Sequence, residues 1–146
     1  MEPAEGWLAC GVTGVGRLPE PVAIVEWLEA QLCKTSELEG TTVLVTAGGT
    51  QENIDPVRYI GNRSSGKMGY AIAEQAVRMG ANVILVSAPT SLSVPSGVEF
   101  VPVDSALSMQ EAVESRYKNV DVVVMAAAVS DFRVLHKAEQ KIKKME

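Results

Sequence analysis

The sequence contains few of the residues that build disulfide frameworks, metal centres or membrane spans. It has 2 cysteines and 1 histidine among 146 residues, and Cys10 and Cys33 lack the paired spacing of a zinc site. The single histidine, His136, disfavours a Ser-His-Asp triad and a His-rich metal centre. No apolar run approaches the roughly 18 residues that suggest a membrane span. We therefore expect no disulfide framework and no membrane partner.

Positive charge is also scarce. Lysine and arginine number 13 against 18 acidic residues, which gives a net charge of −5 and a pI near 5.0. This balance disfavours nucleic acid as a partner. The first residues, MEPAEGW, are acidic where a secretory signal is basic, so cytoplasmic residence is expected. The hydrophobic share of 47% and the charged share of 21% are typical of one ordinary globular domain.

The chain divides into a short N-terminal part, residues 1–40, and a larger part, residues 41–146. Residues 1–20 are rich in glycine and are expected to be irregular. Residues 21–33 predict a helix, since Pro21 suits a first helical turn and apolar residues follow at helical spacing. The polar stretch 34–40 is interpreted as a linker.

From Thr41 onward, apolar stretches alternate with helical patterns. Strands are predicted at 42–46, 82–87, 98–103 and 121–128, and helices at 65–79 and from residue 104 or 105 to about 118. Pro102 places the third strand at a sheet edge. Continuous apolar strands separated by helices indicate a parallel sheet covered on both faces. The fold class is therefore α/β, Rossmann-like and doubly wound, with a mainly parallel sheet in the order 3-2-1-4.

The segment GNRSSGKMG (61–69) is nearly a P-loop. Met68, however, stands where a P-loop has a Ser or Thr for Mg²⁺, and the segment does not follow its strand directly. An anion site at a helix start fits better: Ser64 or Ser65 would cap the helix, and bare N–H groups near Gly66 and Gly69 would face the ligand. The alternative is a serine-capped helix whose glycines only allow close packing.

Two predicted strand ends support the anion site. In a 3-2-1-4 sheet, ligands bind beyond the carboxyl ends of strands one and four, where the strand order reverses. Strand one ends in AGGT (47–50) and strand four in AAAVSD (126–131), which are mostly small residues. A nicotinamide cofactor is disfavoured, because G-x-G-x-x-G and an acid after strand two are both missing. A nucleoside triphosphate or another phosphorylated ligand suits the site. Asp131 can face Mg²⁺ or a ribose, or be only a helix cap or a solvated acid.

Three ordered motifs carry a family resemblance. TAGGTQENIDPVRYIGNRSSGKMG (46–69), AAAVSDFR (126–133) and KIKK (141–144) resemble the phosphopantothenate–cysteine ligase domain of the bifunctional decarboxylase/ligase family of coenzyme A biosynthesis. ACGVTGVGRLPEP (9–21) resembles the tail of the fused decarboxylase domain. Residues 1–40 would then be a decarboxylase remnant and linker, and residues 41–146 the N-terminal half of the ligase domain.

The resemblance implies a two-step reaction. The carboxylate of 4′-phosphopantothenate attacks the α-phosphate of CTP and expels pyrophosphate, and the amine of L-cysteine then attacks the acyl-cytidylate and releases CMP. CTP and Mg²⁺ are the implied cofactors, and FMN belongs only to an intact decarboxylase domain. The intact family protein is expected to be a homo-oligomer.

The resemblance also implies roles for individual residues. Asn62 would handle the acyl-cytidylate, Lys141 would support the transferring phosphate, and Cys10 would be the decarboxylase proton donor. The nucleotide site would comprise Gly48, Ser64, Ser65, Gly66, Gly69, Met125, Ala126, Ala127, Asp131 and Lys141, with Asp131 also the candidate metal ligand. Arg58 and Lys67 are weaker candidates as charge partners of phosphates.

The family domain extends well beyond the length of this chain. The chain is therefore expected to be a fragment, incomplete at the C-terminus, with an exposed sheet edge at strand four. Two other functions stay open: an inactive nucleotide-binding or assembly fragment, and an NAD(P)-binding oxidoreductase.

Overall fold

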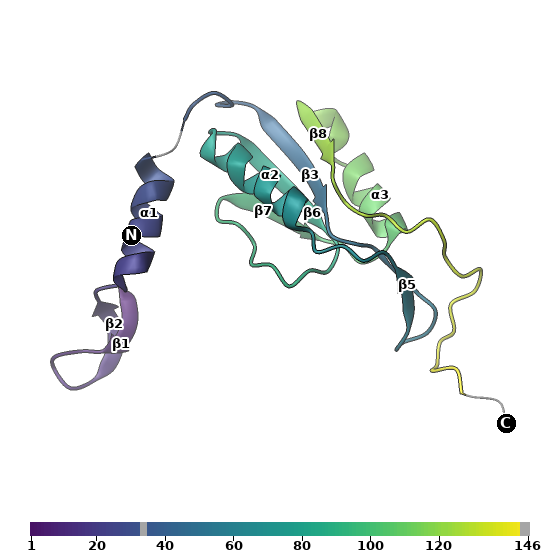
Figure 1. Cartoon of the computed structure of the whole chain (residues 1–146), viewed down its shortest axis with the longest axis horizontal. Helices are drawn as coiled ribbons and strands as arrows, with labels where there is room; N and C mark the ends of the chain where they lie inside the picture. The colour runs from purple at the N-terminus through teal and green to yellow at the C-terminus, as the bar shows by residue number, and fades with distance from the viewer. Residues whose placement is uncertain (33–34, 144–146) are drawn as a thin grey trace. The chain divides into compact units, whose positions relative to one another are not determined.

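A computed structural model describes residues 1–32 and 35–143 (Figure 1). The chain forms two compact units, Met1–Thr35 and Ser36–Glu146. Cys33, which was predicted to end the first helix, and Lys144 of the KIKK motif lie outside the described residues. In the described ranges no helix is both long and apolar enough to cross a membrane.

The first unit is a hairpin followed by a helix, so the prediction that residues 1–20 are irregular is wrong. Strands β1 (Ala4–Trp7) and β2 (Thr13–Arg17) pair antiparallel, and helix α1 spans Pro21–Leu32. The glycines that suggested irregular structure lie within or between the strands, where Gly6 pairs with Gly14. Cys10 is exposed and free in the turn that joins them.

The second unit is built on a four-stranded parallel sheet. Its strands are β3 (Thr42–Ala47), β6 (Asn82–Ser87), β7 (Val98–Pro102) and β8 (Val122–Met125). They lie side by side in the order β7-β6-β3-β8, which corresponds to the predicted order 3-2-1-4. The α/β Rossmann-like fold class is confirmed, and β7 with Pro102 lies at a sheet edge as predicted.

Each face of the sheet is covered by one helix (Figure 1). Helices α2 (Lys67–Arg78) and α3 (Ala106–Glu114) pack on opposite faces. Successive residues of a strand point to opposite faces, so Val43 and Val45 join the core under α2, whereas Leu44 joins the core under α3. Leu38 also packs against the α2 core, so residues 36–40 belong to this unit.

Strand β8 is shorter than the predicted strand 121–128. After Met125 the chain stops pairing with β3, because the N–H groups of Ala126 and Ala127 donate instead to the Thr46 hydroxyl, at 3.1 and 3.2 Å. In the described sheet β8 is the outer strand, and Val122 and Val123 are exposed. The expected open edge is present in this part of the chain.

Helix ends also differ from the predictions. Neither Ser64 nor Ser65 caps α2, because the N-cap is Gly66, whose φ of 74° lies in the left-handed region that favours glycine. Helix α3 is capped by Ser105, one of the two predicted residues. It ends at Glu114 rather than near 118, and a short 3₁₀ turn, η1 (Tyr117–Asn119), follows.

A second hairpin lies between β3 and α2 and was not predicted. Strands β4 (Gln51–Asn53) and β5 (Tyr59–Gly61) pair antiparallel. The hairpin is tied to the sheet unit, since the Glu52 carboxylate accepts the N–H of Ala106 at the start of α3, at 2.8 Å. The strands are too short to show an alternating pattern in the sequence.

Candidate functional site

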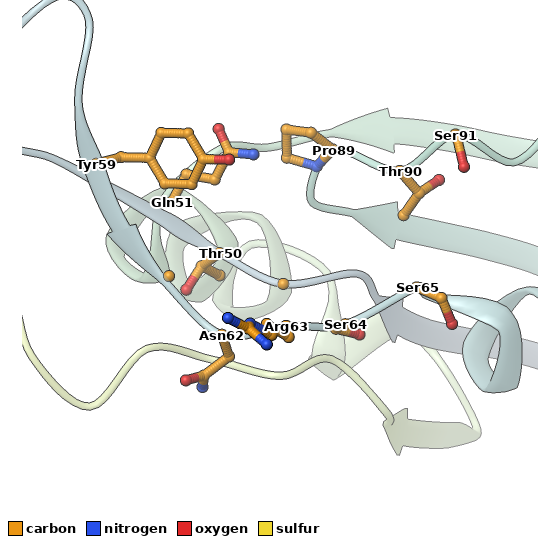
Figure 2. Close-up of a pocket in the computed structure, with 12 residues that line it drawn as sticks. Thr50, Gln51, Tyr59, Asn62, Arg63, Ser64, Ser65, Pro89, Thr90 and Ser91 are labelled. Carbon is orange, nitrogen blue, oxygen red and sulfur yellow. The ribbon is translucent and has the colours of Figure 1, made fainter.

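A polar cleft of about 440 Å³ lies beyond the carboxyl end of β3 (Figure 2). Figure 2 shows Gln51, Tyr59 and Pro89 on one side of the cleft, with Asn62 and Ser64 on the other. The lining residues are Gly49, Thr50, Gln51, Tyr59, Gly61, Asn62, Arg63, Ser64, Ser65, Pro89, Thr90 and Ser91. The cleft lies at the carboxyl edge of the sheet, where a ligand site was predicted. Its lining, however, comes from the segments that follow β3 and β6 rather than from the end of β8, so it is not the predicted crevice between strands one and four.

Three of the predicted site residues, Asn62, Ser64 and Ser65, line this cleft. The Asn62 side chain also connects it to the end of β8, because Nδ2 donates to the Val129 carbonyl at 2.9 Å. The segments that follow β3 and β8 stay adjacent through a parallel bridge between Gly49 and Ala128. The segments predicted to converge at the strand-order reversal are therefore neighbours.

Two of the N–H groups at the start of α2 have serine partners, although the sequence had suggested bare N–H groups near Gly66 and Gly69. The Ser64 hydroxyl accepts from the N–H of Gly66 at 3.3 Å, and the Ser65 hydroxyl accepts from the N–H of Lys67 at 3.5 Å. Gly66 itself is buried, whereas Ser65 is exposed. An anion in the cleft would therefore meet serine hydroxyls and side-chain charge before these two amides.

Close packing explains why glycine occupies positions 48 and 69. A Cβ on Gly48, which has a φ of 79°, would lie 2.6 Å from the Ala88 carbonyl oxygen. A Cβ on Gly69 would lie 2.6 Å from the Ala47 Cβ, inside the contact between α2 and β3. Both glycines are buried. The packing alternative considered from the sequence for the glycines at the start of the helix therefore applies to Gly69, and Gly48 is constrained by packing in the same way.

Arg63 carries the only formal charge among the residues that line the cleft in the described structure. Lys67, the first residue of α2, is exposed near the same helix start. Since cations and hydroxyl groups bind phosphate oxygens, the cleft can hold a phosphorylated ligand.

Arg58 does not line the cleft, and its guanidinium is paired with Asp55. Its Nε and Nη2 donate to the Asp55 carboxylate at 3.0 and 2.5 Å, and Nη2 also donates to the Ile142 carbonyl at 3.0 Å. The Arg58 guanidinium holds the pKa of Asp55 well below its usual range. Burial of the carboxylate opposes this shift, whereas backbone N–H donors, including that of Ile142, add to it. Asp55 therefore stays ionised although its side chain is fully buried.

The remaining predicted nucleotide-site residues do not line the polar cleft. Met125 is exposed and lines a second, mainly apolar groove of about 400 Å³ beside α3. Ala126 and Ala127 are half-buried, and Asp131 and Lys141 are exposed. Within the described ranges no three His, Cys, Asp or Glu residues form a group that can hold a metal ion.

Sequence reasoning missed the residues that hold the site together. Thr46 and Thr50 are fully buried, and the Thr50 hydroxyl accepts the N–H of Ser130 at 2.8 Å. Asp55 was not among the predicted site residues. The one signal in the sequence for Thr46 and Thr50 was a threonine directly beside small residues at the end of a predicted strand, where its hydroxyl can accept a hydrogen bond.

Comparison with known proteins extends the similarity over the whole chain. The coenzyme A biosynthesis bifunctional protein CoaBC of Bacillus subtilis is 51% identical over an alignment of 149 residues, which covers 100% of this chain and 37% of the relative. The CoaBC protein of Escherichia coli is 46% identical over 142 residues, covering 97% of this chain and 35% of the relative. The chain thus spans about a third of the length of these curated relatives.

A solved structure agrees with the fold. The crystal structure of the C-terminal domain of a coenzyme A biosynthesis bifunctional protein CoaBC has a TM-score of 0.65 and 58% identity, covering 68% of this chain and 50% of that one. Residues 38–146 match the family described as the DNA/pantothenate metabolism flavoprotein C-terminal domain. With the Rossmann-like sheet, the ordered motifs and this match in agreement, the chain belongs to the DNA/pantothenate metabolism flavoprotein C-terminal domain family.

Proposed function

We propose that this chain supplies the phosphate-binding half of a ligase of coenzyme A biosynthesis that joins 4′-phosphopantothenate to L-cysteine at the expense of CTP. One observation carries the proposal: Asn62, Ser64 and Ser65 line a polar cleft beyond the carboxyl end of β3, and the Asn62 amide reaches the Val129 carbonyl in the loop after β8. The relatives named as coenzyme A biosynthesis proteins support the pathway.

The proposed reaction has two balanced steps. In the first, a carboxylate oxygen of phosphopantothenate forms a bond to the α-phosphorus of CTP while the bond to pyrophosphate breaks. In the second, the cysteine nitrogen forms an amide bond to the acyl carbon, CMP departs, and the amine loses a proton. Both steps develop negative charge on phosphoryl or acyl oxygens, which fixed donors and cations stabilise.

Arg63 and the hydroxyls of Ser64 and Ser65 are suited to a phosphate group in the cleft. Lys141 would add a cation to the phosphate that reacts. The end of β8, through Met125, Ala126 and Ala127, would contact the nucleotide, and Gly48, Gly66 and Gly69 would hold the surrounding backbone close.

Mg²⁺ would be bound mainly by CTP. In proteins this ion is commonly held by one or two carboxylates together with substrate phosphates. Asp131, exposed on the loop after β8, offers one carboxylate of that kind. The ion would neutralise charge on the triphosphate.

Asn62 is proposed to orient the acyl-cytidylate. One N–H of its amide is engaged by the Val129 carbonyl. Because the amide has a second N–H and an acceptor oxygen, it can still contact the acyl oxygen of the intermediate. The substitution Asn62→Asp would replace the amide donor by a carboxylate that faces the Val129 carbonyl oxygen.

Binding is tested first by calorimetry with CTP, ATP and NADPH, each with and without Mg²⁺. Preferential binding of CTP is expected. Preferential binding of NADPH would favour an oxidoreductase and contradict the proposal. CTP binding without turnover, persisting once the remainder of the family domain is attached, would identify a nucleotide-binding or assembly module instead.

The role of Asn62 is tested in a polypeptide that carries the remainder of the family domain. Asn62→Asp is expected to slow amide formation more than acyl-cytidylate formation, measured by rapid quench of the pyrophosphate and CMP released. Asn82→Asp is the matched control, since Asn82 is exposed at the start of β6. Normal turnover by Asn62→Asp would refute the assigned role.

A further inference from the structure

The Asp55 carboxylate is buried where two distant segments of the chain meet. Its Oδ1 accepts the N–H groups of Val57 and Arg58, both at 2.8 Å, and its Oδ2 accepts from the Arg58 guanidinium. Oδ2 also accepts the N–H of Ile142, 87 residues further along, at 3.1 Å. A buried charge is tolerated only when it is paired and hydrogen-bonded in this way.

The same loop holds the C-terminal segment at two further points. Arg58 Nη2 donates to the Ile142 carbonyl at 3.0 Å, so both backbone polar groups of Ile142 are bound by the Asp55–Arg58 pair. Four residues earlier, the N–H of Ala138 donates to the carbonyl of Ile54 at 2.9 Å. We refer to these contacts together as the Asp55–Arg58 anchor.

The anchored segment, residues 138–142, contains no helix or strand. Ordering such a segment costs conformational entropy at every residue, and no regular hydrogen-bond pattern offsets that cost. Contacts at its two ends therefore determine its conformation. Lys141 lies between them and directly precedes Ile142, while its own side chain is exposed.

We propose that Asp55 and Arg58 are positioning residues, which hold the backbone on either side of Lys141 so that its ammonium group approaches the reacting phosphate from a defined direction. The role of Lys141 in this inference rests on the proposed function, whereas the anchor itself does not. In this inference Arg58 acts through Lys141, since its Nε and Nη2 donate to Asp55 and Ile142.

The anchor is tested by amide hydrogen exchange in the 146-residue chain. Arg58→Gln is expected to accelerate exchange at Ile142 and Ala138 by about tenfold or more, and to leave the amides of β3 unchanged. Arg58→Lys keeps the charge but loses the planar pair of donors, so an intermediate acceleration is expected. The matched control is Arg78→Gln, which removes an arginine that pairs with Glu74 on the surface of α2.

The positioning role is tested by a double-mutant cycle in a polypeptide that carries the remainder of the family domain. Arg58→Gln is expected to lower kcat by about tenfold or more with little change in the KM for CTP. In the background of Lys141→Ala the same substitution should have little further effect, because residues that act through one another are not additive. Arg58→Lys should recover part of the lost kcat.

Each failure points to a different error. Unchanged exchange at Ile142 in Arg58→Gln overturns the anchor. A second outcome is that exchange accelerates in Arg58→Gln while its effect on kcat simply multiplies that of Lys141→Ala in the double variant. This result overturns the positioning role and leaves the ligase proposal intact. If the unsubstituted protein lacks CTP-dependent activity, the proposed function fails and with it the assignment to Lys141, while the exchange result still decides whether the anchor exists.

Discussion

Replacing Thr46 by valine tests whether the end of β8 is held by a single side chain. Thr46 is fully buried at the end of β3, and its Oγ1 accepts the N–H groups of Ala126 and Ala127 at 3.1 and 3.2 Å. Valine has nearly the same shape but no acceptor. The substitution therefore removes the hydrogen bonds while filling the same space.

The expected loss follows from the two donors. An N–H group that loses its partner costs about 1–3 kcal/mol when it is buried. Ala126 and Ala127 are only half-buried, so the low end of this range applies to each. Burial of a methyl group in place of a hydroxyl offsets part of the loss. We expect Thr46→Val to lower the free energy of unfolding by about 1–2 kcal/mol.

The measurements are urea unfolding and residue-specific hydrogen exchange. Exchange at Ala126 and Ala127 should accelerate by more than the global loss of stability requires. Thr42→Val is the matched control, because Thr42 lies on the same strand and the same face but its hydroxyl makes no hydrogen bond to the described residues. Equal stability of the two variants, or unchanged exchange at Ala126 and Ala127, would refute the reasoning.

Two further predictions concern packing and charge. Gly69→Ala should destabilise the chain by about 1–2 kcal/mol, because overpacking costs about 1–3 kcal/mol and the higher helix propensity of alanine offsets up to about 1 kcal/mol of that. Urea unfolding measures the loss. The control, Gln75→Ala on the exposed face of α2, should show no such loss. The pKa of Asp55 is lower in the folded state than in the unfolded state. The ionised Asp55 carboxylate therefore stabilises the fold fully at pH values above its ordinary pKa of about 3.9, and this stabilisation is lost as the pH falls below that value. The unfolding free energy measured between pH 6 and pH 3 should therefore fall less steeply for Asp55→Asn than for the unsubstituted chain, and parallel curves would contradict the assignment.

Much of the architecture was predictable because it depends on local patterns. The apolar runs at 42–46 and 82–87 are strands within one residue of the prediction, since buried parallel strands are apolar on both faces. Their order followed from the handedness of crossover connections, and the placement of β7 at an edge followed from Pro102. A ligand site at the carboxyl edge of the sheet followed from the fold class, but the order predicted it between β3 and β8, whereas the cleft is lined by segments after β3 and β6.

Only the folded chain shows which polar groups meet. One of the donors to Asp55 is an amide 87 residues away, and the donors to the Thr46 hydroxyl lie 80 and 81 residues away. Hydrophobic periodicity repeats within a few residues and is written in any short stretch of sequence. A hydrogen bond between distant segments depends on backbone positions set by the whole fold. The sequence therefore placed a ligand site at the carboxyl edge of the sheet, but not the residues that line the cleft or the groups that hold its walls.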